Sequence, residues 1–195
     1  NKINDISKNE KYAYILGYNQ EELELYFPEY IEINEKKKGT SKKELLREIK
    51  HWYNGYSWDA TTRVYNPFSI LSLFQSLRFD NYWFSSGTPS HLIKLMKEKK
   101  YDVNILKNAE ANILTFDSGS LENIDPVNLL FQTGYLTVSQ KRDLYQIEEY
   151  LLNFPNFEVE TSFYSYLIGD ISNTQPYEAL TLALKLRQSL EYGYV

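Results

Sequence analysis

The chain has 195 residues, of which 43% are hydrophobic and 24% charged, as expected for a folded protein with one good core or two small ones. Its net charge of −5 argues against a nucleic-acid-binding surface spread over the whole chain, although a local basic patch is compatible with it. The absence of cysteine excludes disulfides, zinc–thiolate sites and a cysteine nucleophile, and the presence of only two histidines argues against a histidine-rich metal site.

Aromatic residues make up 16% of the chain, and 18 of them are tyrosines, whose apolar ring and polar tip suit half-buried surfaces between elements. No stretch is long and apolar enough for a transmembrane span, and no signal peptide opens the chain, so we expect a cytoplasmic protein without a membrane partner. Because the first residue is Asn1 rather than Met, we expect an excised piece of a longer protein.

The first half of the sequence carries helix signals. Asn19 is a candidate N-cap for a helix with an acidic first turn, and Pro28 is expected to weaken that helix. The run Lys36–Lys38 is interpreted as a solvated loop or a frayed helix end. Ser41 and Glu44 form a capping-box pattern. The helical stripe behind it comprises Leu45, Leu46, Ile49, Trp52 and Tyr53.

The segment from His51 to Trp58, here called the aromatic corner, ends one helix and leads to the next. Asn54–Gly55 is a helix-ending dipeptide because glycine tolerates positive φ, and Asn66–Pro67 is a helix-starting dipeptide. The helix that follows is expected to carry one apolar face with two flanking residues. These are Phe68, Leu71, Phe74 and Leu77, flanked by Ile70 and Leu73.

Two interpretations of the aromatic corner are open. It is either a structural plug between two helices or a surface that stacks a base or contacts a partner. The plug is favoured because Arg63 is the only basic residue nearby. It predicts that Trp52, Tyr53 and Tyr56 are buried against the helix that begins at Pro67.

The second half changes to a mixed pattern. Thr88–Pro89 and Asp125–Pro126 each predict a helix start, and Gly134 closes the second of these helices. Residues 135–139 and 144–152 predict two strands joined by a polar turn at 140–143. A further helix, a linker at 169–175 and a last helix at 176–192 are expected. Helix, hairpin, helix is typical of a winged-helix module, and a generic α+β hairpin packing is the alternative.

No self-sufficient active site is visible. The phosphate-binding pattern G-x-x-x-x-G-K-[ST] and the dinucleotide pattern G-x-G-x-x-G are both absent. The acidic pairs Glu148–Glu149 and Glu158/Glu160 are interpreted as solvated charge. His51 and His91 have no identifiable acid or nucleophile partner in the sequence. We therefore predict no catalytic and no metal-binding residues in this chain.

Several segments, taken in order, resemble one family. They include Asn4–Ser7, Leu16–Tyr18 and, more specifically, two signatures that resemble WYxGY…YNPxSI and YWxxTGTP, with Ser85–Ser86 in place of the usual x-Thr. GYLT and xPNxEV patterns follow them. The matching residues are Trp52, Tyr53, Asn54, Gly55, Tyr56, Tyr65, Asn66, Pro67, Trp83, Gly87, Thr88, Pro89, Gly134, Tyr135, Pro155 and Asn156.

Together these segments resemble the bacterial AAA-ATPase-like family of uncharacterised proteins, which a PD-(D/E)XK nuclease-like domain commonly follows. The resemblance places the Walker segments upstream of this chain and the nuclease-like domain near or beyond its end. ATP and Mg²⁺ are thus implied only for the longer protein, and no cofactor is expected in this chain. The implied partners are the upstream ATPase core and the downstream nuclease-like domain of the same protein.

The resulting expectation is a mainly α fold with a small β-hairpin, in the α+β class. A helical lid-like subdomain at 1–110 is followed by a winged-helix-like module at 111–172, and 173–195 form a linker and helix towards a further domain. The predicted role is a non-catalytic part that couples the ATPase core to the nuclease-like domain. The alternative is a winged-helix adaptor for protein or nucleic acid, with Lys141 and Arg142 at the hairpin tip as weak basic contacts.

Overall fold

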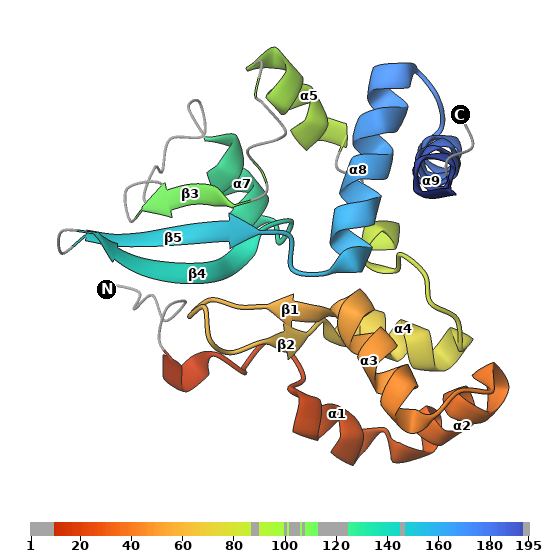
Figure 1. Cartoon of the computed structure of the whole chain (residues 1–195). Helices are drawn as coiled ribbons and strands as arrows, with labels where there is room; N and C mark the ends of the chain where they lie inside the picture. The colour runs from red at the N-terminus through yellow and green to blue at the C-terminus, as the bar shows by residue number, and fades with distance from the viewer. Residues whose placement is uncertain are drawn as a thin grey trace.

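A computed structural model of the chain describes residues 10–86, 90–99, 101, 106, 108–112, 125–144 and 147–192 (Figure 1). It is a mixed structure of helices and two small antiparallel sheets, in agreement with the expected α+β class. The predicted hairpin therefore belongs to a larger sheet, and a second sheet was not expected. Within the described residues, each helix is too short or too polar to span a lipid bilayer.

The N-terminal part is helical, with one two-stranded sheet. Its elements are η1 (Glu10–Tyr12), α1 (Gln20–Tyr26), α2 (Pro28–Lys38), α3 (Lys42–Tyr53), β1 (Asn54–Tyr56), β2 (Val64–Tyr65) and α4 (Pro67–Ser76). The predicted N-caps are confirmed because the side chains of Asn19, Ser41 and Asn66 each accept hydrogen bonds from the first turn of the following helix. Asn19 and Ser41 form full capping boxes.

A first core fills the space between these helices. Its buried side chains are Leu23, Ile31, Leu45, Ile49, Tyr53, Tyr65, Ile70, Leu73 and Phe74. The stripe predicted for α3 is confirmed. The face predicted for α4 is wrong, because Phe68 and Leu71 are 48% and 51% exposed while Ile70 and Leu73 are buried. Both faces of α4 have apolar residues at helical spacing, so only packing against α2 and α3 distinguishes them.

The lysine run is exposed at a helix end and does not form a loop. Lys36–Lys38 form the last turn of α2, which begins at Pro28, and Gly39 ends the helix with a φ of +66°. Positive side chains at a helix C-terminus are favoured by the helix dipole. The helix capped by Asn19 ends at Tyr26, just before Pro28, and Pro28 itself begins a new helix, which was not expected.

The C-terminal part combines helices with a three-stranded antiparallel sheet in the order β3-β5-β4. Its elements are η2 (Trp83–Ser86), α5 (Ser90–Glu98), β3 (Ala109–Asn112), α7 (Pro126–Gln132), β4 (Thr137–Leu144), β5 (Ile147–Asn153), α8 (Phe157–Ser172) and α9 (Pro176–Tyr192). The start of α7 is confirmed by Asp125, whose carboxylate accepts from the amides of Val127 and Asn128. Thr88–Pro89 lie outside the described residues.

Two boundaries in this part differ from the prediction. Residues 140–143, expected as a turn, lie in β4 and pair with residues 148–151 of β5. β4 is at the edge of the sheet, where polar side chains are tolerated in a strand. Residues 169–172, expected as linker, form the last turn of α8. Gly169 lets α9 approach, since a Cβ there would lie 3.0 Å from the Thr174 carbonyl oxygen.

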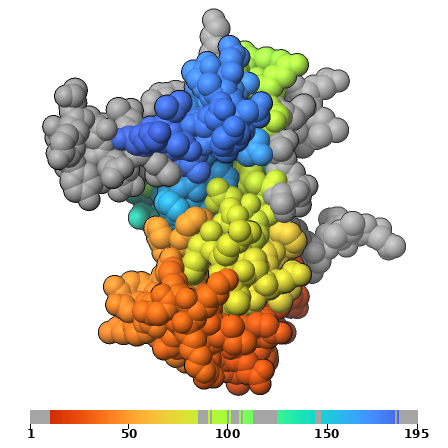
Figure 2. Space-filling model, turned by 90° about the vertical axis from the view of Figure 1, so that its right-hand side faces the viewer, coloured from red at the N-terminus to blue at the C-terminus, as the bar shows by residue number. Residues whose placement is uncertain are grey.

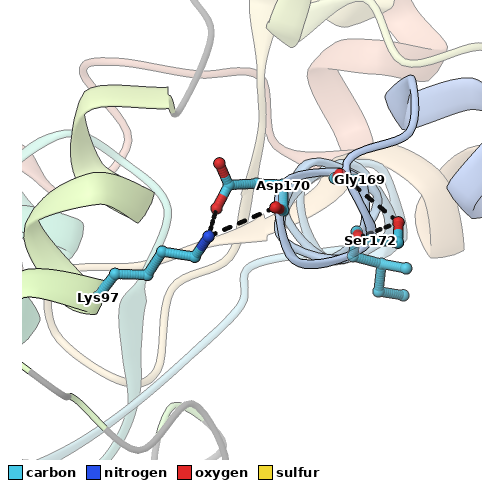
Figure 3. Close-up of polar contacts among 5 residues, drawn as sticks. Lys97, Gly169, Asp170 and Ser172 are labelled. Atoms are coloured by element: carbon cyan, nitrogen blue, oxygen red, sulfur yellow. Dashed lines mark hydrogen bonds and ion pairs between the residues drawn. The ribbon is translucent and has the colours of Figure 1, made fainter.

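A second core lies between the sheet, α5, α7 and α8. Its central buried side chains include Leu106, Leu130, Leu152, Val159 and Phe163. Lys97 on α5 contacts the Asp170 side chain near the end of α8 and ties the two helices together (Figure 3). Figure 2 shows the α4 region between the N-terminal helices and the α8–α9 pair. Along the chain, the change from the first core to the second falls between Tyr82, which packs against the first, and Phe84, which belongs to the second. The domain boundary expected at residue 110 stays a prediction.

Candidate functional site

The two cores contact each other where the aromatic corner meets the segment before α8, a region here called the junction. The closest approach is between Gly55 in β1 and Pro155. Gly55 has a φ of +139°, and a Cβ added to it would lie 1.8 Å from the Pro155 carbonyl oxygen. Only glycine permits both this backbone conformation and this contact. Two motifs about a hundred positions apart in the sequence thus touch at their backbones.

The loop between β1 and β2 holds the edge of β4 by hydrogen bonds. The Thr137 hydroxyl lies 2.7 Å from the Ser57 amide, from which it accepts, and 2.6 Å from the Ser57 carbonyl oxygen, to which it donates. The Val138 amide also donates to Ser57 at 3.1 Å. This pairing covers the first part of the β4 edge, which would otherwise expose unpaired backbone groups.

Arg63 completes that contact. Its guanidinium donates to the carbonyl oxygens of Val138 at 2.8 Å and Ser139 at 2.9 Å, and to those of Gly55 and Ala60 on its own loop. Burial lowers the pKa of Arg63, and the nearby Asp59 carboxylate opposes that change. A planar group with several fixed donors can join four carbonyls in this way, which a lysine cannot do.

Asp59 shapes the loop that carries Arg63. Its carboxylate accepts from the amides and hydroxyls of Thr61 and Thr62, at 2.7–2.9 Å, and from the Ser57 hydroxyl. Burial raises the pKa of this carboxyl, but the hydrogen bonds from the two threonines together lower it to about 2. Asp59 is therefore ionised at neutral pH and holds the loop in one conformation.

Glu158, in the first turn of α8, is the central polar group of the junction. Its side chain is fully buried, and its carboxylate accepts from the Ser69 hydroxyl on α4 and from the Trp83 amide on η2, both at 2.8 Å. Burial raises the pKa of Glu158 to about 7, although the hydrogen bonds from Trp83 and Ser69 favour the charged form. The solvated position expected for this residue is thus wrong.

Aromatic rings fill the rest of the junction. Trp83 packs edge-to-face on Tyr135 with ring centroids 4.9 Å apart, and Gly134 lies against Trp83 and Tyr56. On the other side, Trp52 packs edge-to-face on Phe157 at 4.8 Å. Each pair joins a residue before position 84 to one beyond position 130. Such contacts stabilise by roughly 1 kcal/mol each beyond the area that they bury.

The structural-plug interpretation of the aromatic corner is confirmed for Tyr53, which is fully buried in the first core, and in part for Trp52, which packs against that core. It is wrong for Tyr56, which packs against the second core. The corner therefore bridges the two cores and does not serve one of them alone.

A shallow open pocket of about 290 Å³ lies beside the junction. The described residues that form its walls include no charged side chain. They include the rings of Tyr56, Trp58 and Trp83 together with Asn66, Pro67 and Gly134. Five of these six residues belong to the motifs that carry the family resemblance.

The predicted motif residues come together in space. Those described by the structure lie at the end of α3, in β1 and β2, at the start of α4, in η2, in the α7–β4 connection and before α8. They are Trp52, Tyr53, Asn54, Gly55, Tyr56, Tyr65, Asn66, Pro67, Trp83, Gly134, Tyr135, Pro155 and Asn156. Gly87, Thr88 and Pro89 lie outside the described residues.

Lys141 and Arg142 lie away from this group of residues, within β4 and not at a hairpin tip. The Lys141 ammonium is 2.5 Å from the Glu148 carboxylate, and Arg142 lies opposite Glu149 on β5. Acidic neighbours thus offset the basic charge of this strand. A nucleic-acid contact through these two residues stays a prediction.

Sequence reasoning missed Glu158, and it noted Arg63 only as an isolated basic residue. One signal for Glu158 was available in the sequence. The residue lies two residues after Asn156, whose side chain caps α8, and is therefore in the first turn of that helix, where side chains face neighbouring elements. Arg63 has no comparable local signal, since two of its four acceptors, the carbonyl oxygens of Val138 and Ser139, lie on a strand distant in sequence.

The resemblance implies ATP and Mg²⁺ only for the longer protein, and this stays a prediction. The sequence lacks the phosphate-binding loop, and in the part of the chain that the structure describes, acidic and histidine side chains do not gather in groups of three that could hold a metal ion.

Comparison with known proteins gives one informative similarity. An uncharacterised protein of Azotobacter chroococcum mcd 1, encoded in the vnfD 5′ region, is 33% identical over 169 residues. The alignment covers 86% of this chain and 30% of that protein, so the chain spans less than a third of its relative. No family model matches the chain, and no solved structure matches it.

Proposed function

We propose that this chain is a non-catalytic, lid-like and winged-helix-like part of an AAA-ATPase-like protein, and that it couples a P-loop core to a nuclease-like domain. One observation carries the proposal: motif residues from separate segments converge on a single contact between two cores. A lid that transmits the state of a nucleotide needs such a joint, because coupling requires a contact whose two sides can rearrange.

The order of elements in the second core supports the winged-helix-like part. Among the described residues, helix α5, strand β3, helix α7 and the β4–β5 hairpin come in this order along the chain, and the last strand occupies the centre of the sheet. This is the order expected of a winged-helix module. The junction attaches that module to the helical part through β4 and the start of α8.

Calorimetric titration of the isolated 195-residue chain with Mg-ATP tests the non-catalytic assignment, and we expect no binding. Micromolar affinity would refute it. The coupling role is tested in the intact protein with Arg63→Lys, which weakens the junction and leaves the nucleotide-binding residues of the proposed core untouched. We expect ATP hydrolysis to persist while its effect on the nuclease-like domain is reduced. Unchanged coupling in a variant with a weakened junction would contradict the proposal.

The alternative function is an adaptor in which the winged-helix-like module binds protein or nucleic acid. Helix α7, which precedes the hairpin, has the sequence PVNLLFQ and no basic residue, and the Lys141 charge is already paired. These features favour a protein partner, because phosphate contacts need lysine or arginine. A DNA mobility shift at low salt that is lost as salt rises would support the nucleic-acid version, and its absence would exclude that version.

A further inference from the structure

We propose that Glu158 is a protonation-controlled latch, so that a neutral carboxyl keeps the junction between the two cores closed and ionisation favours its opening. The inference concerns the junction itself, and it holds whether or not the chain couples an ATPase to a nuclease-like domain.

The position of Glu158 makes it a latch. It belongs to the second core through α8, it is hydrogen-bonded to the first core through Ser69, and it is hydrogen-bonded to the connecting segment through the Trp83 amide. One side chain thus joins all three parts. If the cores separate, these two hydrogen bonds break together and the carboxyl becomes solvated.

The surroundings of the carboxyl disfavour its charged form. It is fully buried, and within the described residues it forms no ion pair with a lysine or arginine. A buried carboxylate without a cation is destabilising even when neutral donors contact it.

Titratable groups on the neighbouring elements surround Glu158. Asp80 adds negative charge and raises the pKa of Glu158. The hydroxyls of Tyr53, Tyr56 and Tyr82 also interact with it, and burial raises the pKa of each of them, so they are uncharged at neutral pH. His51 on α3 lies against Phe157 with ring centroids 4.8 Å apart.

The direction of the effect follows from linkage. Burial raises the pKa of Glu158 from 4.5 to about 7 in the closed junction, whereas an opened junction exposes the carboxyl to water. Proton uptake therefore favours the closed form. The closed-to-open ratio falls as pH rises, in total by about 300-fold between a pH well below 4.5 and a pH well above 7.

Hydrogen exchange of the Trp83 amide in the intact protein tests the latch, because this amide donates to Glu158. With intrinsic exchange rates corrected, we expect protection to fall by up to about 70-fold between about pH 5 and pH 8. In Glu158→Gln, protection should be independent of pH. Glu160→Gln, in the same turn of α8, is the matched control and should behave like the wild type, as should His51→Gln. A flat wild-type profile would overturn the latch, as would loss of pH dependence in Glu160→Gln or His51→Gln.

A second variant tests the latch even if Glu158→Gln does not fold. Ser69→Ala removes a donor that favours the ionised carboxylate. The midpoint of the protection profile should therefore move to higher pH, and isotope-edited infrared spectroscopy of the glutamate carboxyls should show the same movement. A midpoint that stays in place or moves to lower pH contradicts the latch.

Discussion

Gly55→Ala is the sharpest test of the junction. The added Cβ would lie 1.8 Å from the Pro155 carbonyl oxygen and 2.8 Å from its carbonyl carbon. An ordinary contact is roughly 3.5 Å, so the two backbones must separate by about 1.7 Å. Both atoms of Pro155 are backbone, and no side-chain rotation can relieve the clash.

The magnitude follows from two contributions. A φ of +139° is strained for alanine and costs about 1–3 kcal/mol. Separation of the backbones also lengthens hydrogen bonds that Arg63 and Thr137 make across the junction, at about 1 kcal/mol each. We expect Gly55→Ala to lower the free energy of unfolding by about 3–5 kcal/mol.

Gly39→Ala is the matched control. Gly39 also has a positive φ, of +66°, but nothing lies within 4 Å of its added Cβ, so only the backbone cost of about 1–2 kcal/mol applies. Urea unfolding followed by tryptophan fluorescence and circular dichroism gives the free energy of unfolding of both variants, provided that its dependence on urea concentration has the same slope in each. If the two variants lose the same stability, the close contact with Pro155 does not constrain the junction and the reasoning fails.

Three further substitutions test single groups by urea unfolding. The pKa of Glu158 is raised to about 7, so the stability due to its proton is present below about pH 4.5 and is lost as pH rises through about 7. Glu158→Gln should therefore be up to about 3 kcal/mol more stable than the wild type at pH 8 and should lose that advantage in acid. Equal stabilities at pH 8 would count against burial of the charge. The pKa of Asp59 is lowered to about 2, so its contribution to the free energy of unfolding is present above about pH 4 and is lost as pH falls through about 2. Asp59→Asn should therefore cost about 2 kcal/mol at neutral pH and little in strong acid. Arg63→Lys should cost about 2 kcal/mol because the hydrogen bonds to four carbonyl oxygens cannot all be kept. Arg78→Lys, at an exposed position, is the control and should leave stability unchanged. Equal losses in the two variants would show that the guanidinium geometry is unimportant.

Local chemistry explains which expectations about the fold were right. Asn19, Ser41 and Asn66 cap helices as predicted because a capping side chain bonds to amides two or three residues away. Proline starts α4 and α7 for the same local reason, since its fixed φ suits the first turn of a helix. The choice of buried face on α4 is different, because two faces of that helix are apolar.

Part of the junction could also be anticipated. The sequence marked Gly55 and Pro155 as motif residues, but it contained no information that one would touch the other. Strand β3 was missed because Ala109–Asn112 is short and poor in β-branched residues, and becomes a strand through pairing with β5. Lys141 and Arg142 were assigned to a turn because they are polar, although an edge strand accepts such residues.

The sequence by itself determined the starts of α1, α3, α4 and α7, the end of α3 at the aromatic corner and the amphipathic stripe of α3, because each depends on residues within about two turns of the chain. The tertiary structure alone decided that Glu158 is buried, that Arg63 joins its own loop and β1 to β4, and that the motif residues meet at one contact. Burial and long-range hydrogen bonds depend on which segments become neighbours in space, and that information is distributed over the whole chain.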